Sequence, residues 1–237
     1  ESIFFLCVVI MLIGIKENKD IFLYIGIFFA ILTRPAFVVI IPALIITDIL
    51  SNETNKSYQR WIVYLIITVI GVSIVGVIQH YDTGEWFYFF EAQTGWGNKL
   101  QIPKLPLTSW AGGLIVRLDG FAFLIGFLSG LSILVFILKL KSFPRISIPR
   151  EVIFSLSYLA GITLLVLVSR GGSLFSLNRF IFSTPFIIVV LNYWFSLEYS
   201  FKLKQLLYIF GFIFLFWLLF GSYVHIQAAL KFLLLSL

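Results

Sequence analysis

Apolar runs separated by short polar breaks follow one another along almost the whole chain. The runs lack the alternating ten-residue pattern that is typical of an outer-membrane barrel. Their length and continuity predict apolar helices that cross a bilayer. The predicted spans are residues 2–16, 21–33, 36–50, 61–80, 119–140, 151–169, 180–198 and 206–223, with the apolar tail 225–237 as a candidate start of a further span. The expected fold is all-α: a single polytopic transmembrane helical bundle over 1–237, with about seven to nine spans.

The composition fits this class. Hydrophobic residues make up 60% of the chain, charged residues 12%, and the mean hydropathy is +1.05, which excludes an ordinary soluble domain. The net charge of +6 is spread over short loops, without the basic cluster that would indicate nucleic-acid binding. Cys7 is the only cysteine, so an intrachain disulfide and a cysteine-cluster metal site are both excluded.

Basic residues in the predicted connections indicate how the bundle is oriented. The densest basic turn, 139–150, carries four lysines and arginines, and the positive-inside rule places it in the cytoplasm. Alternation of the spans then places the break at 33–35, the long loop 81–118 and the turn 170–179 on the opposite, outer side. The unusual polar residues of the chain thus gather on one predicted face.

The tripeptide Thr33-Arg34-Pro35 interrupts an apolar run that carries no other charge from Ile21 to Thr47. A charge within a membrane span costs roughly 2.5 kcal/mol or more, so Arg34 is a candidate functional residue. Pro35 disfavours helix at Arg34 and predicts a break into two short pieces. The alternative is a proline kink whose arginine only extends to the lipid headgroups.

The loop 81–118 is longer than a simple connection requires and is too aromatic to be disordered. Its first part, 84–96, predicts a short interfacial helix. Gln93, Trp96 and Asn98 are candidate binding residues in this loop. The alternative is an aromatic belt at the headgroups, which has no part in catalysis.

Arg170 and Arg179 flank a turn that contains Gly171-Gly172 on the same face. The planar guanidinium matches phosphate geometry, and paired glycines let the backbone approach an anion closely. With Arg34, these arginines could meet a phosphate at the membrane boundary. The alternative is that each arginine merely marks a membrane edge.

Acidic residues on the outer face offer no diagnostic pair for general acid–base catalysis. They are Glu1, Asp82, Glu85, Glu91 and Asp119. His80 and His225 lack metal-site partners, so no metal is predicted. Nucleotide-binding motifs and a nucleophile elbow are also missing from the sequence, which favours a lipid-borne donor over a nucleotide.

Four segments together resemble the landmarks of a family of multispanning mannosyltransferases. They are Glu1-Ser2-Ile3-Phe4, Leu32-Thr33-Arg34-Pro35 with Pro42, Phe90-Glu91-Ala92-Gln93-Thr94-Gly95-Trp96-Gly97 with Pro103, and Leu177-Asn178-Arg179-Phe180 with Pro185. Their order and spacing are similar to the PIG-V type, the second mannosyltransferase of glycosylphosphatidylinositol synthesis, and its bacterial relatives in the GT-C superfamily. Phe180 stands where that family usually has tyrosine.

The resemblance implies inverting transfer of a hexose, with mannose first, from a polyprenyl-phosphate-sugar (dolichyl-phosphate mannose in eukaryotes) to a lipid or glycan acceptor. Transfer would occur on the non-cytoplasmic face, without a cofactor. Arg34 and Arg179 would contact the donor phosphate, with Arg170 as a further candidate binding residue, whereas Gln93, Trp96 and Asn98 would shape the sugar or acceptor pocket.

The same resemblance implies an acidic catalytic residue upstream of Glu1, with Glu1 in support, so this chain alone is expected to be inactive. The short loops favour the bacterial plasma membrane; a eukaryotic member would lie in the endoplasmic reticulum. Two alternatives stay open: a transporter or flippase of lipid-linked saccharides, and a polymerase of them. A transporter should show a second broken helix in a symmetric repeat, and the sequence contains no internal repeat.

Overall fold

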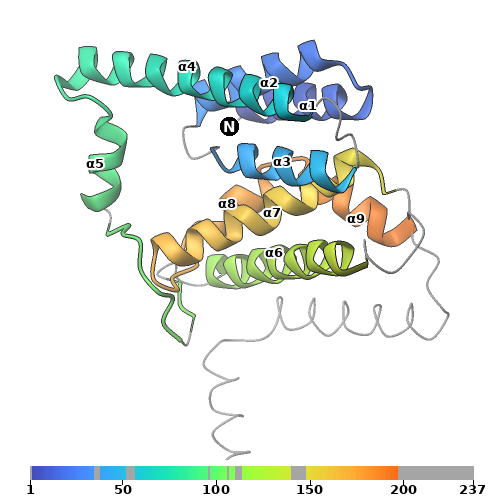
Figure 1. The fold of residues 1–237 in the computed structure, drawn as a ribbon. Coiled ribbons are helices and arrows are strands. Elements are labelled where there is room, and N and C mark those ends of the chain that lie inside the picture. Colours follow the sequence, from blue (N-terminus) through green and yellow to red (C-terminus); the bar gives the residue numbers. More distant parts are fainter. Residues whose placement is uncertain are drawn as a thin grey trace, which may run out of the picture.

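The computed structural model describes residues 2–34, 38–51, 57–95, 97–105, 107–109, 114–139 and 148–196. Every regular element in these ranges is a helix, which confirms the all-α class (Figure 1). The helices are α1 (Ser2–Lys16), α2 (Asp20–Thr33), α3 (Ile40–Leu50), α4 (Ser57–Thr83), α5 (Tyr88–Gly95), α6 (Leu114–Lys139), α7 (Arg150–Ser169), α8 (Leu177–Phe182) and α9 (Phe186–Ser196).

Three of these helices, α4, α6 and α7, are long and apolar enough to cross a membrane. The described part of the chain therefore contains fewer full-length spans than the seven to nine expected. Helices form at the predicted spans 2–16, 21–33 and 36–50, but they have 15, 14 and 11 residues. At 1.5 Å per residue, none of them reaches the roughly 30 Å of a bilayer core. The predicted spans 206–223 and 225–237 lie outside the described residues.

The predicted span 180–198 is also divided. Its apolar sequence forms α8 and α9, separated by a turn at Ser183, Thr184 and Pro185. Proline cannot donate a helical hydrogen bond, and it disfavours helical backbone at the residue before it. Hydrophobicity continues on both sides of this second break, so the apolar pattern predicted a single span there.

The connections reverse the chain repeatedly. Helices α2 and α4 run parallel, because three contacts along them join residues that are each 40 positions apart. These contacts are Asp20–Arg60, Tyr24–Tyr64 and Ile31–Gly71. The last residues of α3 lie beside the start of α4, where Asp48 accepts a hydrogen bond from Trp61, so α2 and α3 form a hairpin. The break at Arg34 therefore lies at one end of the bundle, and a proline kink within a single span is excluded.

The remaining long helices continue this antiparallel order. The start of α7 contacts the end of α3 through Arg150 and Asp48, and α6 crosses α7 where Gly126 approaches Thr163. We call the end with Asp20, Asp48, Arg60 and Arg150 the basic end. The opposite end, with the α2–α3 connection, α5 and the turn after α7, is the loop end (Figure 1).

An ion pair that joins distant helices organises the basic end. The Asp48 side chain is 1% exposed, and its Oδ1 lies 2.8 Å from Nη2 of Arg150. Its Oδ2 accepts hydrogen bonds from Trp61 Nε1 at 3.2 Å and the Tyr64 hydroxyl at 3.4 Å. Arg150 also donates to Oδ1 of Asn18. These contacts fix α3, α4, α7 and the α1–α2 turn to one another.

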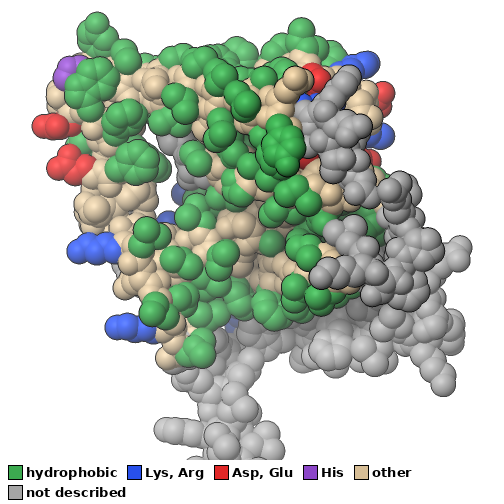
Figure 2. Space-filling view, viewed as in Figure 1, with side chains coloured by type: hydrophobic (Ala, Val, Ile, Leu, Met, Phe, Trp, Pro, Cys, Tyr) green, Lys and Arg blue, Asp and Glu red, His purple; other side chains and the backbone are tan. Residues whose placement is uncertain are grey.

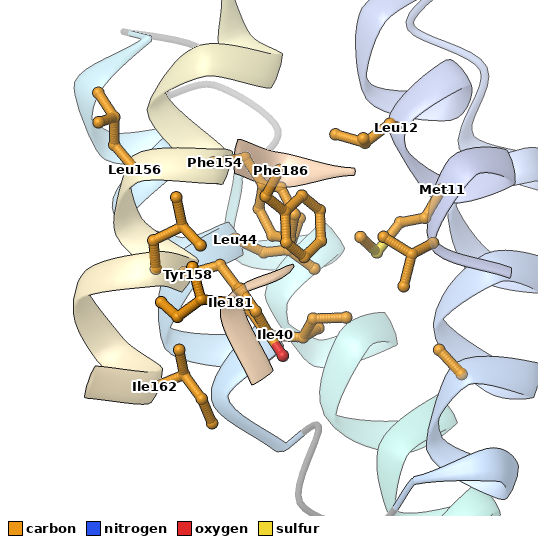
Figure 3. Packing of buried hydrophobic residues seen from close by; sticks show 14 of the residues in the cluster. Met11, Leu12, Ile40, Leu44, Phe154, Leu156, Tyr158, Ile162, Ile181 and Phe186 are labelled. Atoms are coloured by element: carbon orange, nitrogen blue, oxygen red, sulfur yellow. The ribbon is translucent and has the colours of Figure 1, made fainter. Parts of the chain in front are cut away.

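The core lies between the helices and is continuous. Phe154 and Tyr158 of α7 surround Phe186 of α9, with ring centroids 5.3 and 4.5 Å from it (Figure 3). In contrast, α4 exposes a band of large apolar side chains to the exterior. These include Ile62, Leu65, Ile66, Val69 and Ile70. Hydrophobic side chains likewise cover much of the face in Figure 2, as expected for a surface in contact with lipid.

Candidate functional site at the loop end

Arg34 is the C-terminal cap of α2 and links three helices. Its backbone is extended (φ −148°, ψ 97°), as expected for a residue that precedes proline. The partly buried guanidinium lies over two aromatic rings, with Cζ 5.2 Å from the centroid of Phe4 and 5.4 Å from that of Phe180. Its Nη1 donates a hydrogen bond of 3.3 Å to Oγ of Ser183. The arginine thus connects the start of α1, the end of α2 and the region of α8.

The depth of Arg34 follows from the parallel register of α2 and α4. The constant offset of 40 residues places Arg34 level with Ile74. Gln79, the first strongly polar residue towards the C-terminal end of α4, is five residues further on, and therefore about 7.5 Å away along the axis. The end of α4 at Thr83 is about 14 Å away. Arg34 therefore lies below the apolar boundary that Gln79 marks on α4, but close enough for its side chain to reach that boundary.

Arg179 belongs to the helix that Arg34 contacts. It is exposed, and its backbone carbonyl accepts a hydrogen bond from Oγ of Ser183, the partner of Arg34. Arg34 thus contacts Phe180, directly after Arg179, and Ser183, one helical turn after Arg179. The structure brings the two predicted phosphate-binding arginines into one region, and the sequence analysis missed Ser183 as the link between them.

Gln93, Asn98 and Arg170 form a continuous hydrogen-bonded chain. Asn98 Nδ2 donates to Gln93 Oε1 at 2.6 Å, and Arg170 Nε donates to Asn98 Oδ1 at 3.0 Å. Arg170 also donates to the carbonyl of Phe175 and lies over its ring at 5.7 Å. Three residues predicted separately for the site are therefore in direct contact. The observed bonds hold the long loop to the end of α7, and a phosphate contact of Arg170 stays a prediction.

The Arg170 guanidinium is partly buried in this arrangement. Burial lowers its pKa from the usual value, and the nearby carboxylate of Asp119 opposes that decrease. Arginine begins so far above neutrality that the side chain stays charged at physiological pH. The chain from Gln93 to Arg170 therefore ends in a permanent positive charge beside a buried carboxylate.

The glycine turn packs closely against the backbone of the long loop. Gly171 and Gly172 have φ of +57° and +96°, and a Cβ on Gly172 would lie 2.5 Å from the carbonyl oxygen of Lys104. The backbone N–H groups of Lys104 and Thr108 donate to the carbonyls of these two glycines. The glycines thus permit a close approach of the long loop, whereas an anion at this turn stays a prediction.

The predicted helix within loop 81–118 is present as α5, over Tyr88–Gly95. Aromatic side chains attach its start to the end of α4: Trp86 stacks on His80 with centroids 4.4 Å apart, and Phe87 packs on Gly76. Figure 2 shows an opening in the surface between α4, α5 and the rest of the bundle, with Lys or Arg side chains visible inside it. Two predicted site residues, Glu1 and Trp96, lie outside the described residues.

The carboxylates at the loop end divide into two kinds. Three of them are exposed: Asp82 on α4, Glu85 between α4 and α5, and Glu91 on α5. Asp119 is completely buried near the start of α6, where Oδ2 accepts from Ser109 Oγ at 2.7 Å and Oδ1 accepts from the backbone N–H of Asn178 at 3.0 Å. With both oxygens occupied, Asp119 suits a structural task better than proton transfer. Within the described ranges, no group of three His, Cys, Asp or Glu residues could hold a metal ion.

Comparisons with protein families, characterised proteins and solved structures find no match to this chain.

Proposed function

We propose that this protein is a membrane glycosyltransferase of the GT-C type, similar to the PIG-V family. It would move a hexose, with mannose as the first candidate, from a polyprenyl-phosphate donor to a lipid or glycan acceptor on the non-cytoplasmic face. One observation carries this proposal: Arg34 lies below the apolar boundary and contacts the helix that bears Arg179. A phosphate on a long prenyl chain is an anion that reaches this depth.

The surroundings of Arg34 favour recognition of a phosphate. The rings of Phe4 and Phe180 lie against the guanidinium and shield it from water, and Ser183 helps to fix its orientation. Charge-assisted hydrogen bonds are stronger in such low-dielectric surroundings than in water. Arginine can offer two parallel N–H groups to a pair of phosphate oxygens. Arg34 and Arg179 would together neutralise the donor phosphate.

The same charges would act on the reaction itself. In the proposed transfer, an acceptor hydroxyl oxygen attacks the anomeric carbon as the bond from that carbon to the phosphate oxygen breaks. The electron pair of this bond moves to the prenyl phosphate, which gains negative charge, and the hydroxyl proton passes to a general base. Arginines placed at the phosphate stabilise the charge that develops there, which lowers the barrier. Gln93, Trp96 and Asn98 would line the sugar or acceptor site above them.

A transporter or flippase of lipid-linked saccharides is the second candidate, and one observation favours it. The apolar segment 180–198 is interrupted at Ser183, between α8 and α9, and Oγ of this residue accepts a hydrogen bond from Arg34. A discontinuous helix at a binding site is typical of secondary transporters. A polymerase of such saccharides would use the same arginines.

Reconstitution in liposomes separates the two candidates. The protein purified from its complete gene, with any sequence that precedes Glu1, would receive polyprenyl-phosphate mannose with a labelled sugar, together with a lipid extract as acceptor. The transferase proposal expects the label to move into a new product, with loss of this product in Arg179→Gln. A flippase would instead expose the intact donor on the opposite leaflet and form no product. That second outcome would refute the transferase.

A further inference from the structure

We propose that Asp119 is a positioning residue that holds α8, and with it Arg179, in place for phosphate binding. The inference rests on the proposed function for its purpose, but the contacts that support it do not. Asp119 is 0% exposed, and its carboxylate joins segments that are far apart in the chain. Ser109 in the long loop bonds one oxygen, and Asn178 on α8 bonds the other.

The contact with α8 is the important one. Helix α8 has six residues, and a helix of this length is not stable by itself in solution. Its N-terminal cap, Ser176, makes no side-chain capping bond and has a left-handed backbone (φ 62°). The carboxylate of Asp119 satisfies the N–H of Asn178 in the first turn instead, from another helix. A buried acceptor thus takes over the task that a local cap usually performs.

The residue directly after Asn178 is Arg179, and the next one, Phe180, contacts Arg34. A shift of the first turn of α8 would therefore move both predicted phosphate ligands relative to each other. Phe182 of the same helix packs on Phe121 of α6, with centroids 5.6 Å apart, so α8 has an apolar contact as well as this polar one. Loss of the carboxylate should loosen the start of α8 without unfolding the bundle.

Hydrogen exchange tests the structural half of the inference without any ligand. Mass spectrometry of the protein in nanodiscs would follow the amides of residues 174–183. Asp119→Ala should accelerate their exchange by about tenfold or more, because the N–H of Asn178 loses its acceptor. Asp119→Asn keeps an acceptor oxygen and should stay close to wild type. Asp82→Ala removes an exposed carboxylate from the end of α4 and serves as the charge-matched control.

Binding of farnesyl phosphate and of farnesol to the same variants tests the functional half. Asp119→Ala should weaken farnesyl phosphate binding by about fivefold and leave farnesol binding unchanged, since farnesol shares the chain but lacks the phosphate. A purely structural role would not alter the ratio of the two affinities. If Asp119→Ala does not accumulate, Asp119→Ser replaces it, because its hydroxyl is too short to reach both partners.

The outcomes are distinct. Unchanged exchange in Asp119→Ala would overturn the inference, and so would faster exchange with unchanged farnesyl phosphate binding. Weakened binding in Asp119→Asn with normal exchange would assign the effect to charge and also overturn it. Should wild type fail to bind farnesyl phosphate, the proposed function fails, while the exchange result still decides whether Asp119 holds α8.

Discussion

Replacing Arg150 with methionine should destabilise the basic end strongly, because it leaves the Asp48 carboxylate buried without its ion-pair partner. Removing one member of a buried pair costs about 3–5 kcal/mol. The side chains are 14% and 1% exposed, and Trp61 and Tyr64 still donate to Asp48, so we expect the lower value, about 3 kcal/mol. For a chain of this size, the melting temperature should fall by about 6–12 °C.

Thermal unfolding in detergent, followed by tryptophan fluorescence, measures this effect against a matched control at the same end. Arg60 pairs with Asp20 at 3.4 Å, but the Asp20 side chain is 46% exposed. Arg60→Met should therefore cost less than about 1 kcal/mol, or about 3 °C. The double variant Arg150→Met/Asp48→Asn removes the stranded charge and should recover more than half of the loss. Equal melting temperatures for Arg150→Met and Arg60→Met would refute the reasoning.

Three further predictions concern the topology and the loop end. Cysteines placed at Lys19 and Lys99 in a cysteine-free protein should react with an impermeant reagent from opposite sides of the membrane; labelling from one side would contradict the topology. Alanine at either Gly171 or Gly172 would be strained at its positive φ by about 1–3 kcal/mol. Gly172→Ala should in addition detach the long loop, because its Cβ would meet the backbone of Lys104, whereas the Cβ in Gly171→Ala meets only the flexible side chain of Gln101; amide exchange of 99–105 compares the two. In the protein expressed from its complete gene, Trp96→Ala should reduce sugar transfer at normal expression, but an aromatic belt would tolerate both Trp96→Ala and Trp96→Phe.

Local sequence patterns were sufficient for most helices. The apolar runs predicted α1 and α2 to within one residue at each end, and they located α3, α4, α6 and α7. The proline after Arg34 correctly indicated a break. The proline at 185 should have indicated one too, but the apolar run continues through it, so hydrophobicity alone predicted a single span there.

Contacts between distant residues could not be predicted in the same way. Asp48 and Arg150 are 102 residues apart, and Asp119 and Asn178 are 59 apart. The spacing of neither pair is a sequence signal, because the packing of the helices determines which donors reach a buried carboxylate. For the same reason, the sequence placed Gln93, Asn98 and Arg170 on one face but could not show that they bond to one another.

The measurement that tests the central claim most directly is the affinity of the purified protein for farnesyl phosphate, compared between wild type and Arg34→Lys. Lysine keeps the charge and most of the reach of arginine, but it cannot offer two N–H groups in one plane. An interfacial arginine that only extends to the headgroups should tolerate the change. Lys99→Gln removes an exposed basic residue from the same end and controls for net charge.

We predict that Arg34→Lys weakens farnesyl phosphate binding by at least about tenfold, which corresponds to about 1.4 kcal/mol, with farnesol binding and melting temperature unchanged. Lys99→Gln should bind as wild type does. Wild-type affinity for farnesyl phosphate in Arg34→Lys would contradict the phosphate role of Arg34, and with it the proposed donor site.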